Sequence, residues 1–219
     1  MQKFFLYTIL IIVYLGLAKT LSPSEHGIQF IKNETHFSKL FKGKNLTVIL
    51  VDTHATGFLI KTFYQKLRVI SDYEHIDEMI VRTNKEFAKK NKDFIGLSIY
   101  RKHDEGEEFL PLPPGSLYID NPEYGEWKTN KKGITYWSFY KTYKNFPKYL
   151  GWGKFKLTKD FLQQMKNAIT LKQPFYGPNK EFGPEGKITQ KNFPHFFSED
   201  RKKKTDLKTL LLQYLKENF

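Results

Sequence analysis

The most uniformly apolar stretch of the chain lies at its N-terminus. Phe4–Ala18 is an almost unbroken hydrophobic run that follows Lys3, and small residues stand at its end. A positive residue, an apolar run and small residues in this order are typical of a secretory signal peptide. The run is short for a membrane-spanning helix, which needs about 20 residues. We therefore expect residues 1–18 to be a signal peptide or, if uncleaved, an N-terminal anchor. A buried helix of the mature fold is the alternative.

Further along, the hydrophobic spacing predicts two strands with two helices between them. Val48–Val51 is a run of aliphatic, mostly β-branched residues and indicates a strand. Apolar residues three and four apart predict a helix over Ala55–Arg68. A second helix is expected from Asp72, as its N-cap, to about Asn91. Phe94–Tyr100 is expected to be the second strand.

After residue 104 the pattern becomes one of short β-rich segments. Ser116–Ile119, Gly125–Thr129 and Ile134–Tyr143 are the expected strands, and Asn130–Gly133 is a plausible hairpin turn between the last two.

Two helices with an irregular segment between them are expected toward the C-terminus. Thr158 is a good N-cap for a helix that ends near Leu171. Gln173–Pro194 contains many prolines and glycines and is expected to be irregular. Leucines at helical spacing over Ser198–Phe219 predict an amphipathic helix at the end of the chain.

The order of these elements predicts an α+β fold, with a small mixed or mostly antiparallel sheet flanked by helices. In domain terms, residues 19–24 are a linker and residues 25–197 a single α+β domain. Residues 198–219 are the C-terminal amphipathic helix, expected to pack on that domain.

Charge and cysteine content narrow the setting in which the protein works. The 219 residues include 36 lysines and arginines against 23 carboxylates, which gives a net charge of +13, and there is no cysteine. The positive charge favours anionic partners. The absence of cysteine excludes disulfides and thiolate-ligated metals. An exported chain without cysteine suits a bacterial periplasm or cell surface. We expect a periplasmic or secreted protein, membrane-anchored by residues 4–18 if these are retained.

The candidate catalytic residues are Asp52 and His54. They follow the best strand and precede the expected helix, so they would lie at the end of a strand, where catalytic groups often lie in α/β sheets. The backbone amides of the turn could hold an anion there. The alternative is that Asp52 caps the helix and His54 is an ordinary loop residue.

Two further groups of titratable residues contain side chains that can bind metal ions, but their spacing matches no metal-binding motif. His103–Glu108 is an acidic cluster that does not match a calcium loop, and Glu74–Glu78 carries one histidine on a predicted helix. Nucleotide-binding glycine motifs are absent. We expect no metal and no cofactor, and read both groups as solvated surface.

The candidate ligand-binding residues are aromatic residues interleaved with lysines. They are Trp127, Trp137, Tyr140, Lys141 and Trp152. Aromatic rings stack on sugars or bases, and lysines neutralise anions. If the segment is a hairpin, both of its faces carry aromatic residues, so some rings are expected at the surface.

These observations lead to one first hypothesis and two alternatives. The first is an exported cell-envelope protein that binds an anionic or saccharide polymer through the aromatic and lysine residues. Export makes cell-wall glycan the expected partner rather than nucleic acid, and limits membrane contact to an uncleaved N-terminal segment. The alternatives are a periplasmic hydrolase that uses Asp52 and His54, and an envelope scaffold that docks through the C-terminal helix. Whether the protein is an enzyme stays open.

Overall fold

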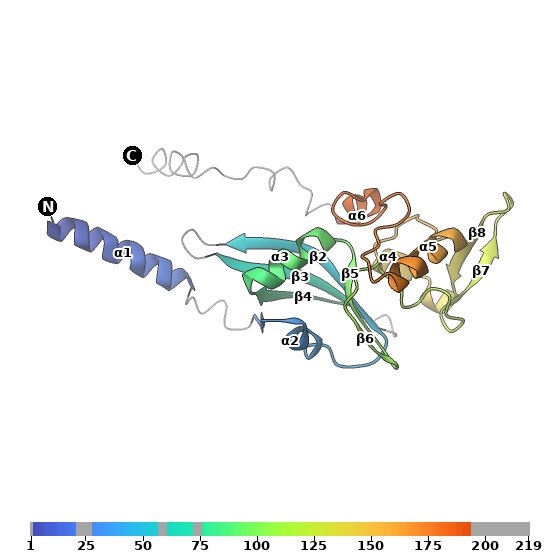
Figure 1. The fold of residues 1–219 in the computed structure, drawn as a ribbon, viewed down its shortest axis with the longest axis horizontal. Helices are drawn as coiled ribbons and strands as arrows, with labels where there is room; N and C mark the ends of the chain where they lie inside the picture. Colours follow the sequence, from blue (N-terminus) through green and yellow to red (C-terminus); the bar gives the residue numbers. More distant parts are fainter. Residues whose placement is uncertain (1, 21–27, 57–60, 72–75, 194–219) are drawn as a thin grey trace.

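The computed structural model describes residues 2–20, 28–56, 61–71 and 76–193. Within these residues the fold is α+β, as predicted, and consists of a large sheet, a two-stranded hairpin and several short helices (Figure 1). The predicted C-terminal helix over residues 198–219 lies outside the described residues, as do residues 72–75 and most of the predicted linker.

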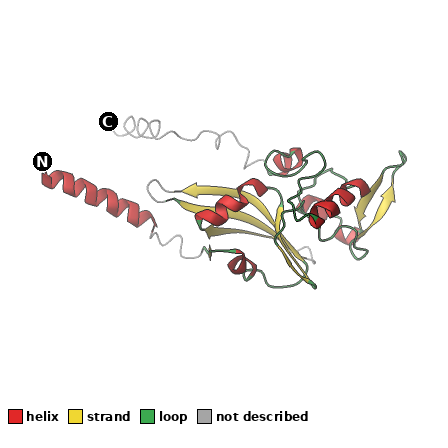
Figure 2. Ribbon diagram, in the orientation of Figure 1, coloured by secondary structure: helices red, strands yellow, loops and turns green. Residues whose placement is uncertain are grey.

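The large sheet has six strands and is mostly antiparallel (Figure 2). The spatial order of its strands is β1-β4-β3-β2-β5-β6, and only the pair β1–β4 is parallel. The strands are β1 (Phe30–Ile31), β2 (Leu46–Thr56), β3 (Thr62–Ser71), β4 (Ile76–Thr83), β5 (Ser98–His103) and β6 (Gly106–Glu108). The predicted strand over residues 48–51 is therefore confirmed, but it is longer than expected.

The helix expected over residues 55–68 is wrong. Strand β3 occupies this part of the chain and pairs with β2 from Leu46↔Ser71 to Thr56↔Thr62. The apolar residues that suggested a helix also fit a strand, because Phe63 and Leu67 are four apart and so share a face in both structures. β-branched residues at Val69 and Ile70 favour the strand.

The second predicted helix is also wrong over most of its length. Strand β4 runs from Ile76 to Thr83, and a helix, α3 (Lys85–Asn91), begins only afterwards. Its N-cap is Asn84, whose side chain accepts a hydrogen bond from the backbone N–H of Phe87. An asparagine cap satisfies an amide that the first helical turn leaves without a partner, which fixes the start of the helix here.

Two short helices cover one face of the sheet. These are α2 (Glu34–Ser38) and α3, which is continued by a 3-10 turn, η2 (Lys92–Phe94). The core beneath them combines aliphatic strand residues with rings from the helices, and its most buried members are Phe37, Val48, Leu50, Leu67, Val81 and Tyr100.

The second half of the chain packs on the opposite face of the sheet. Val48 and Leu50 of β2 belong to the core beneath the helices, whereas Ile49 and Val51 belong to a second core. Because alternate residues of a strand point to opposite faces, the two cores lie on the two sides of the sheet. Eight of the eighteen buried residues in this second core are aromatic, and all eight lie within residues 118–193.

Short elements build this second half. They are β7 (Gly125–Thr129), β8 (Thr135–Phe139), η3 (Lys141–Tyr143), α4 (Phe146–Tyr149), α5 (Lys159–Thr170) and α6 (Lys187–Asn192). The predicted hairpin is confirmed, since β7 and β8 pair through the turn at Asn130–Gly133. The helix capped by Thr158 is also confirmed. Ser116–Ile119 forms turns rather than the expected strand.

The N-terminal apolar run forms a separate helix, α1 (Gln2–Thr20) (Figure 1). Its large apolar side chains between Phe4 and Leu15 are 43–81% exposed, and they belong to neither core. The alternative of a buried core helix therefore has no support in the described contacts. Among the described residues, no helix combines the length and the apolarity needed to cross a membrane.

Candidate functional site

The β7–β8 hairpin separates the predicted ligand-binding residues into an inner and an outer set. Trp127 pairs with Trp137 across the hairpin, and Lys128 pairs with Tyr136. Side chains alternate between the two faces of a strand, so the two tryptophans share one face and Lys128 and Tyr136 share the other. The tryptophan face points into the protein, since Trp137 is only 5% exposed.

Trp152 is part of the same aromatic core. Its side chain is 3% exposed, and its Nε1–H donates a 2.8 Å hydrogen bond to the backbone carbonyl of Pro114. The rings of Phe139 and Phe155 lie 5.5 and 6.3 Å from it. A ring packed in this way has no free face on which a sugar could stack. Trp137 and Trp152 therefore hold the fold together instead of presenting a binding surface.

The outer face of the hairpin carries the aromatic rings that remain accessible. Lys156 Nζ lies 4.0 Å from the centre of the Tyr136 ring, a cation–π contact. Tyr140 is 40% exposed, and Lys141 beside it is exposed as well. Of the predicted ligand-binding residues, Tyr140 and Lys141 thus lie at the surface.

Trp127 lies at the border between the inner and the outer set. Its Nε1–H donates a 2.9 Å hydrogen bond to Asp120, and Lys159 lies over its ring. Asp120 also accepts a 2.8 Å hydrogen bond from Lys166. The Lys166 ammonium and the Trp127 donor hold the pKa of the Asp120 carboxyl below its ordinary value of 3.8. These bonds fix Trp127 in place at one edge of the hairpin.

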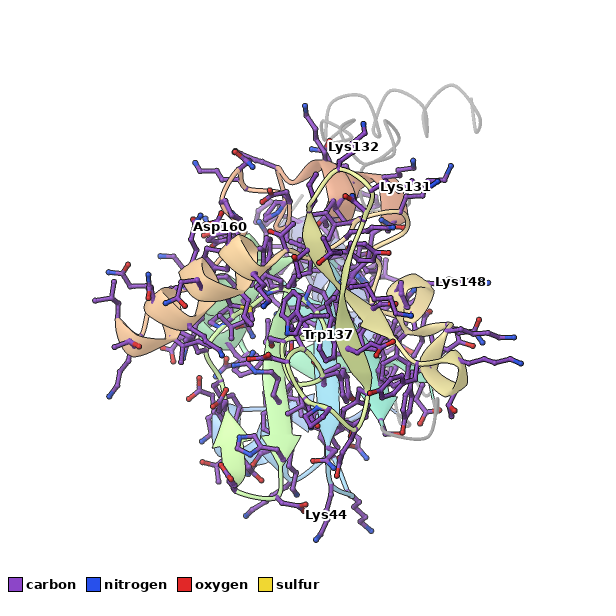
Figure 3. All side chains as sticks on the ribbon, turned by 90° about the vertical axis from the view of Figure 1, so that its right-hand side faces the viewer. Lys44, Lys131, Lys132, Trp137, Lys148 and Asp160 are labelled. Carbon is purple, nitrogen blue, oxygen red and sulfur yellow. The ribbon has the colours of Figure 1, made fainter. Side chains whose placement is uncertain are left out.

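Exposed lysines are the dominant feature of this half. We call residues 125–193 the lysine-rich region: it contains fourteen lysines against four carboxylates, and every one of these lysines is exposed. Figure 3 shows Lys131 and Lys132 at the tip of the hairpin and Lys148 projecting to one side. Of these fourteen lysines, only Lys128 and Lys166 form ion pairs with carboxylates of the described residues.

Asp52 and His54 lie in a different environment from the one expected. Strand β2 continues through both residues to Thr56, so neither stands at the end of a strand, and the next element among the described residues is strand β3. His54 stacks on Tyr64 of β3 with ring centres 5.1 Å apart, and Asp52 lies opposite Lys66. In the part of the chain that the structure describes, no group of three or more metal-ligating side chains is present.

The acidic cluster at residues 103–108 lies in the β5–β6 hairpin, where Arg101 and two lysines pair with three of its carboxylates. Glu108 binds Arg101 at 2.8 Å, and Asp104 binds Lys44 at 3.0 Å. Arg101 is 2% exposed and also donates to the backbone carbonyl of Leu110, while burial lowers its pKa. These contacts are those of a structural ion-pair network.

Glu78, the described end of the second acidic group, is likewise paired. It accepts from Lys66 at 2.6 Å and from Arg68 at 2.8 Å. The hydrogen bond from Lys66 is the main cause that lowers the pKa of Glu78 below its ordinary value of 4.5. Because two cations already surround this carboxylate, it is a poor candidate for a metal ligand.

The lysines beyond residue 152 are the part of the site that sequence reasoning missed. Lys154, Lys156, Lys159 and Lys166 belong to the same exposed set as the hairpin lysines, yet the prediction stopped at Trp152. Counting charges separately along the two halves of the chain would have found them.

Comparison of the chain with models of protein families, with curated proteins and with solved structures found no match.

Proposed function

We propose that this protein is exported to the cell envelope and binds a polyanion there through the lysine-rich region. The observation that carries the proposal is the charge of that region, fourteen exposed lysines against four carboxylates. Lysines without carboxylate partners are available to neutralise phosphate or carboxylate groups along a polymer, and such contacts attract it over the distance of a Debye length.

The proposed interaction depends on charge more than on stacking. Trp137 and Trp152 are buried, which leaves Tyr140 as an exposed ring at the end of the hairpin and Trp127 and Tyr136 as half-buried rings. The expected ligand is therefore an acidic cell-wall glycan or another anionic envelope polymer, with neutral saccharides as weaker ligands.

The order of features at the N-terminus supports export. Lys3 precedes an apolar run that ends in small residues, the arrangement of a signal peptide or an N-terminal anchor. The exposure of the α1 side chains agrees with this proposal, because these side chains belong to neither of the two described cores.

The hydrolase alternative receives no comparable support. Asp52 and His54 lie within a strand, and no described acidic or histidine cluster accompanies them. The scaffold alternative depends on residues 198–219, which lie outside the described residues. Both remain predictions from the sequence.

Co-sedimentation of the full chain with purified cell-wall material tests the proposal, with heparin as a soluble polyanion and dextran as a neutral polymer. We expect binding to cell wall and heparin that weakens as salt rises, and little binding to dextran. Changing Lys131, Lys132 and Lys156 to Gln should weaken binding about a hundredfold, since each lysine at an anionic surface contributes about 1 kcal/mol and about 1.4 kcal/mol is a factor of ten.

The matched control changes three exposed lysines outside the lysine-rich region to Gln, namely Lys32, Lys39 and Lys89. Both triple variants lower the net charge by the same amount. Equal losses of affinity in the two variants would show that net charge alone matters, and salt-independent binding would contradict the proposal altogether.

A further inference from the structure

A pocket of about 390 Å³ lies on the helix-covered side of the sheet, away from the β7–β8 hairpin. Helices α2 and α3 form one side of it and strand β5 contributes to its wall. Two loops complete it, at residues 109–111 and at residues 172–174 after α5. The volume is at the lower end of the range of pockets that hold small molecules, about 300–1,000 Å³.

The walls of the pocket are mostly apolar. Phe37, Phe87 and Ile99 come from the core beneath the helices, and Phe109 and Leu110 come from the loop after β6. Apolar walls favour an apolar ligand body, because binding removes hydrocarbon surface from water on both sides.

One amide in the wall lacks a hydrogen-bond partner. Asn91 is 6% exposed, and its Nδ2 donates to no acceptor among the described residues. A buried donor without an acceptor costs free energy, and an oxygen atom of a ligand could relieve that cost.

The charged side chains at the pocket carry one net positive charge. Glu34 and Lys90 form an ion pair at 2.5 Å, so their charges cancel. Lys172 forms no ion pair among the described residues. A ligand that suits this balance carries a single negative charge.

Lys172 also occupies a backbone position that favours glycine. It follows the C-cap of α5 with φ of +53°, and the next amide, that of Gln173, donates to the carbonyl of Ala168 at 3.0 Å. Glycine is the usual residue at this position of a helix end, because it adopts the left-handed conformation without strain. A lysine here supplies a charge beside the pocket at some cost in backbone strain.

We propose that this pocket binds a small apolar monocarboxylate, with its hydrocarbon body between the phenylalanines and its carboxylate near Lys172. The proposal does not depend on polymer binding, which uses lysines spread over the surface.

Calorimetry with the full chain tests it, using octanoate and 1-octanol as probes with the same hydrocarbon chain. We expect octanoate to bind and octanol to bind several-fold more weakly. The Lys172→Gly variant should bind octanoate roughly two- to fivefold more weakly, the effect of losing one partly exposed ion pair.

Lys180→Gly is the matched control, because Lys180 is also an exposed lysine with a positive φ, +54°, and does not line the pocket. It should bind octanoate like the unchanged protein. If octanol binds as tightly as octanoate, or if the two glycine variants bind octanoate equally, the proposal is overturned.

A second pair of variants tests the place of binding. Leu110→Trp fills the pocket and should abolish octanoate binding, whereas Leu171→Trp, at an exposed position that does not line the pocket, should leave it unchanged. Retained binding by a folded Leu110→Trp variant would overturn the proposal. If circular dichroism shows that this variant does not fold, the glycine pair decides the matter.

Discussion

Residues 28–108, which we call the sheet region, carry fourteen lysines and arginines against twelve carboxylates, whereas the lysine-rich region carries fourteen lysines against four carboxylates. At least seven cations of the sheet region form ion pairs, among them Arg101 with Glu108 and Lys90 with Glu34. The net charge of +13 is thus concentrated in one part of the molecule, and that part is where an anionic ligand is expected.

The two regions also differ in what they bury. Aliphatic side chains from the strands, such as Val48, Leu50 and Leu67, form much of the core of the sheet region, whereas rings such as Trp137, Phe146 and Trp152 make up a larger share of the other core. Aromatic residues and lysines that alternate along the sequence therefore do not all lie on one surface. The hairpin points Trp137 inward and its lysines outward with Tyr136, so the comparison can be tested by changing buried rings and exposed lysines separately.

The largest expected effect is on the aromatic core. Trp152→Ala should lower the free energy of unfolding by about 3–5 kcal/mol, as large-to-small changes of buried aromatic residues do. Tyr140→Ala, at a 40% exposed ring, should change it by only about 0.5 kcal/mol. Urea denaturation measures both. Similar losses in the two variants would mean that Trp152 is not a core residue, and polymer binding by Trp152 variants is interpretable only where they stay folded.

A smaller effect is expected in the sheet region, where charges are paired. Glu108→Ala leaves the buried guanidinium of Arg101 without its carboxylate and should cost about 3 kcal/mol. Asp104→Ala breaks the exposed pair with Lys44 and should cost between about 0 and 1 kcal/mol. Thermal and urea unfolding of both variants provide the measurement. An equal cost would show that burial does not distinguish the two pairs.

The smallest effect concerns Asp120, the carboxylate that pairs with a lysine of the lysine-rich region. Its pKa is lowered in the folded protein, so it stabilises the fold above its ordinary value of 3.8, and this stabilisation disappears as the pH falls through the folded pKa. Asp120→Asn should therefore be less stable than the unchanged protein at pH 7, by no more than about 1 kcal/mol.

The difference between the two proteins should shrink as the pH is lowered below about 4 and the unchanged carboxylate gains its proton. Urea midpoints compared at pH 7 and pH 3 give the answer. A gap that grows toward low pH would contradict the assignment of the Lys166 and Trp127 hydrogen bonds.

The sequence predicts an element correctly where a clear turn or a single helix-capping residue determines the local structure. The hairpin at residues 125–139 has a clear turn at Asn130–Gly133, and helix α5 has Thr158 as its cap. Local spacing wrongly predicts helices where strands β3 and β4 lie. Phe63 and Leu67 are four residues apart, as are Ile76 and Ile80, and residues at this spacing share a face in both helices and strands. Pairing with β2 decides between the two, and that long-range contact cannot be read from local spacing.

The candidate site likewise contains some features that the sequence predicts and others that depend on the fold. The excess of lysines follows directly from counting charges along the chain, and the exposure of Lys131 and Lys132 follows from their position in a turn. The burial of Trp137 and Trp152 depends on helix α5 and the irregular segment after it, which supply Phe161 and Phe182 to the same core. Such contacts arise only when distant segments come together, so local spacing gave no signal for them.

The two outermost strands of the large sheet are very short. Strand β1 has two residues and β6 has three, and β6 ends in Glu107 and Glu108. Long unpaired strands act as templates on which other chains can add, and short or charged edges discourage such growth. A sheet with such edges should resist edge-to-edge aggregation between copies of the chain, even where their local concentration is high.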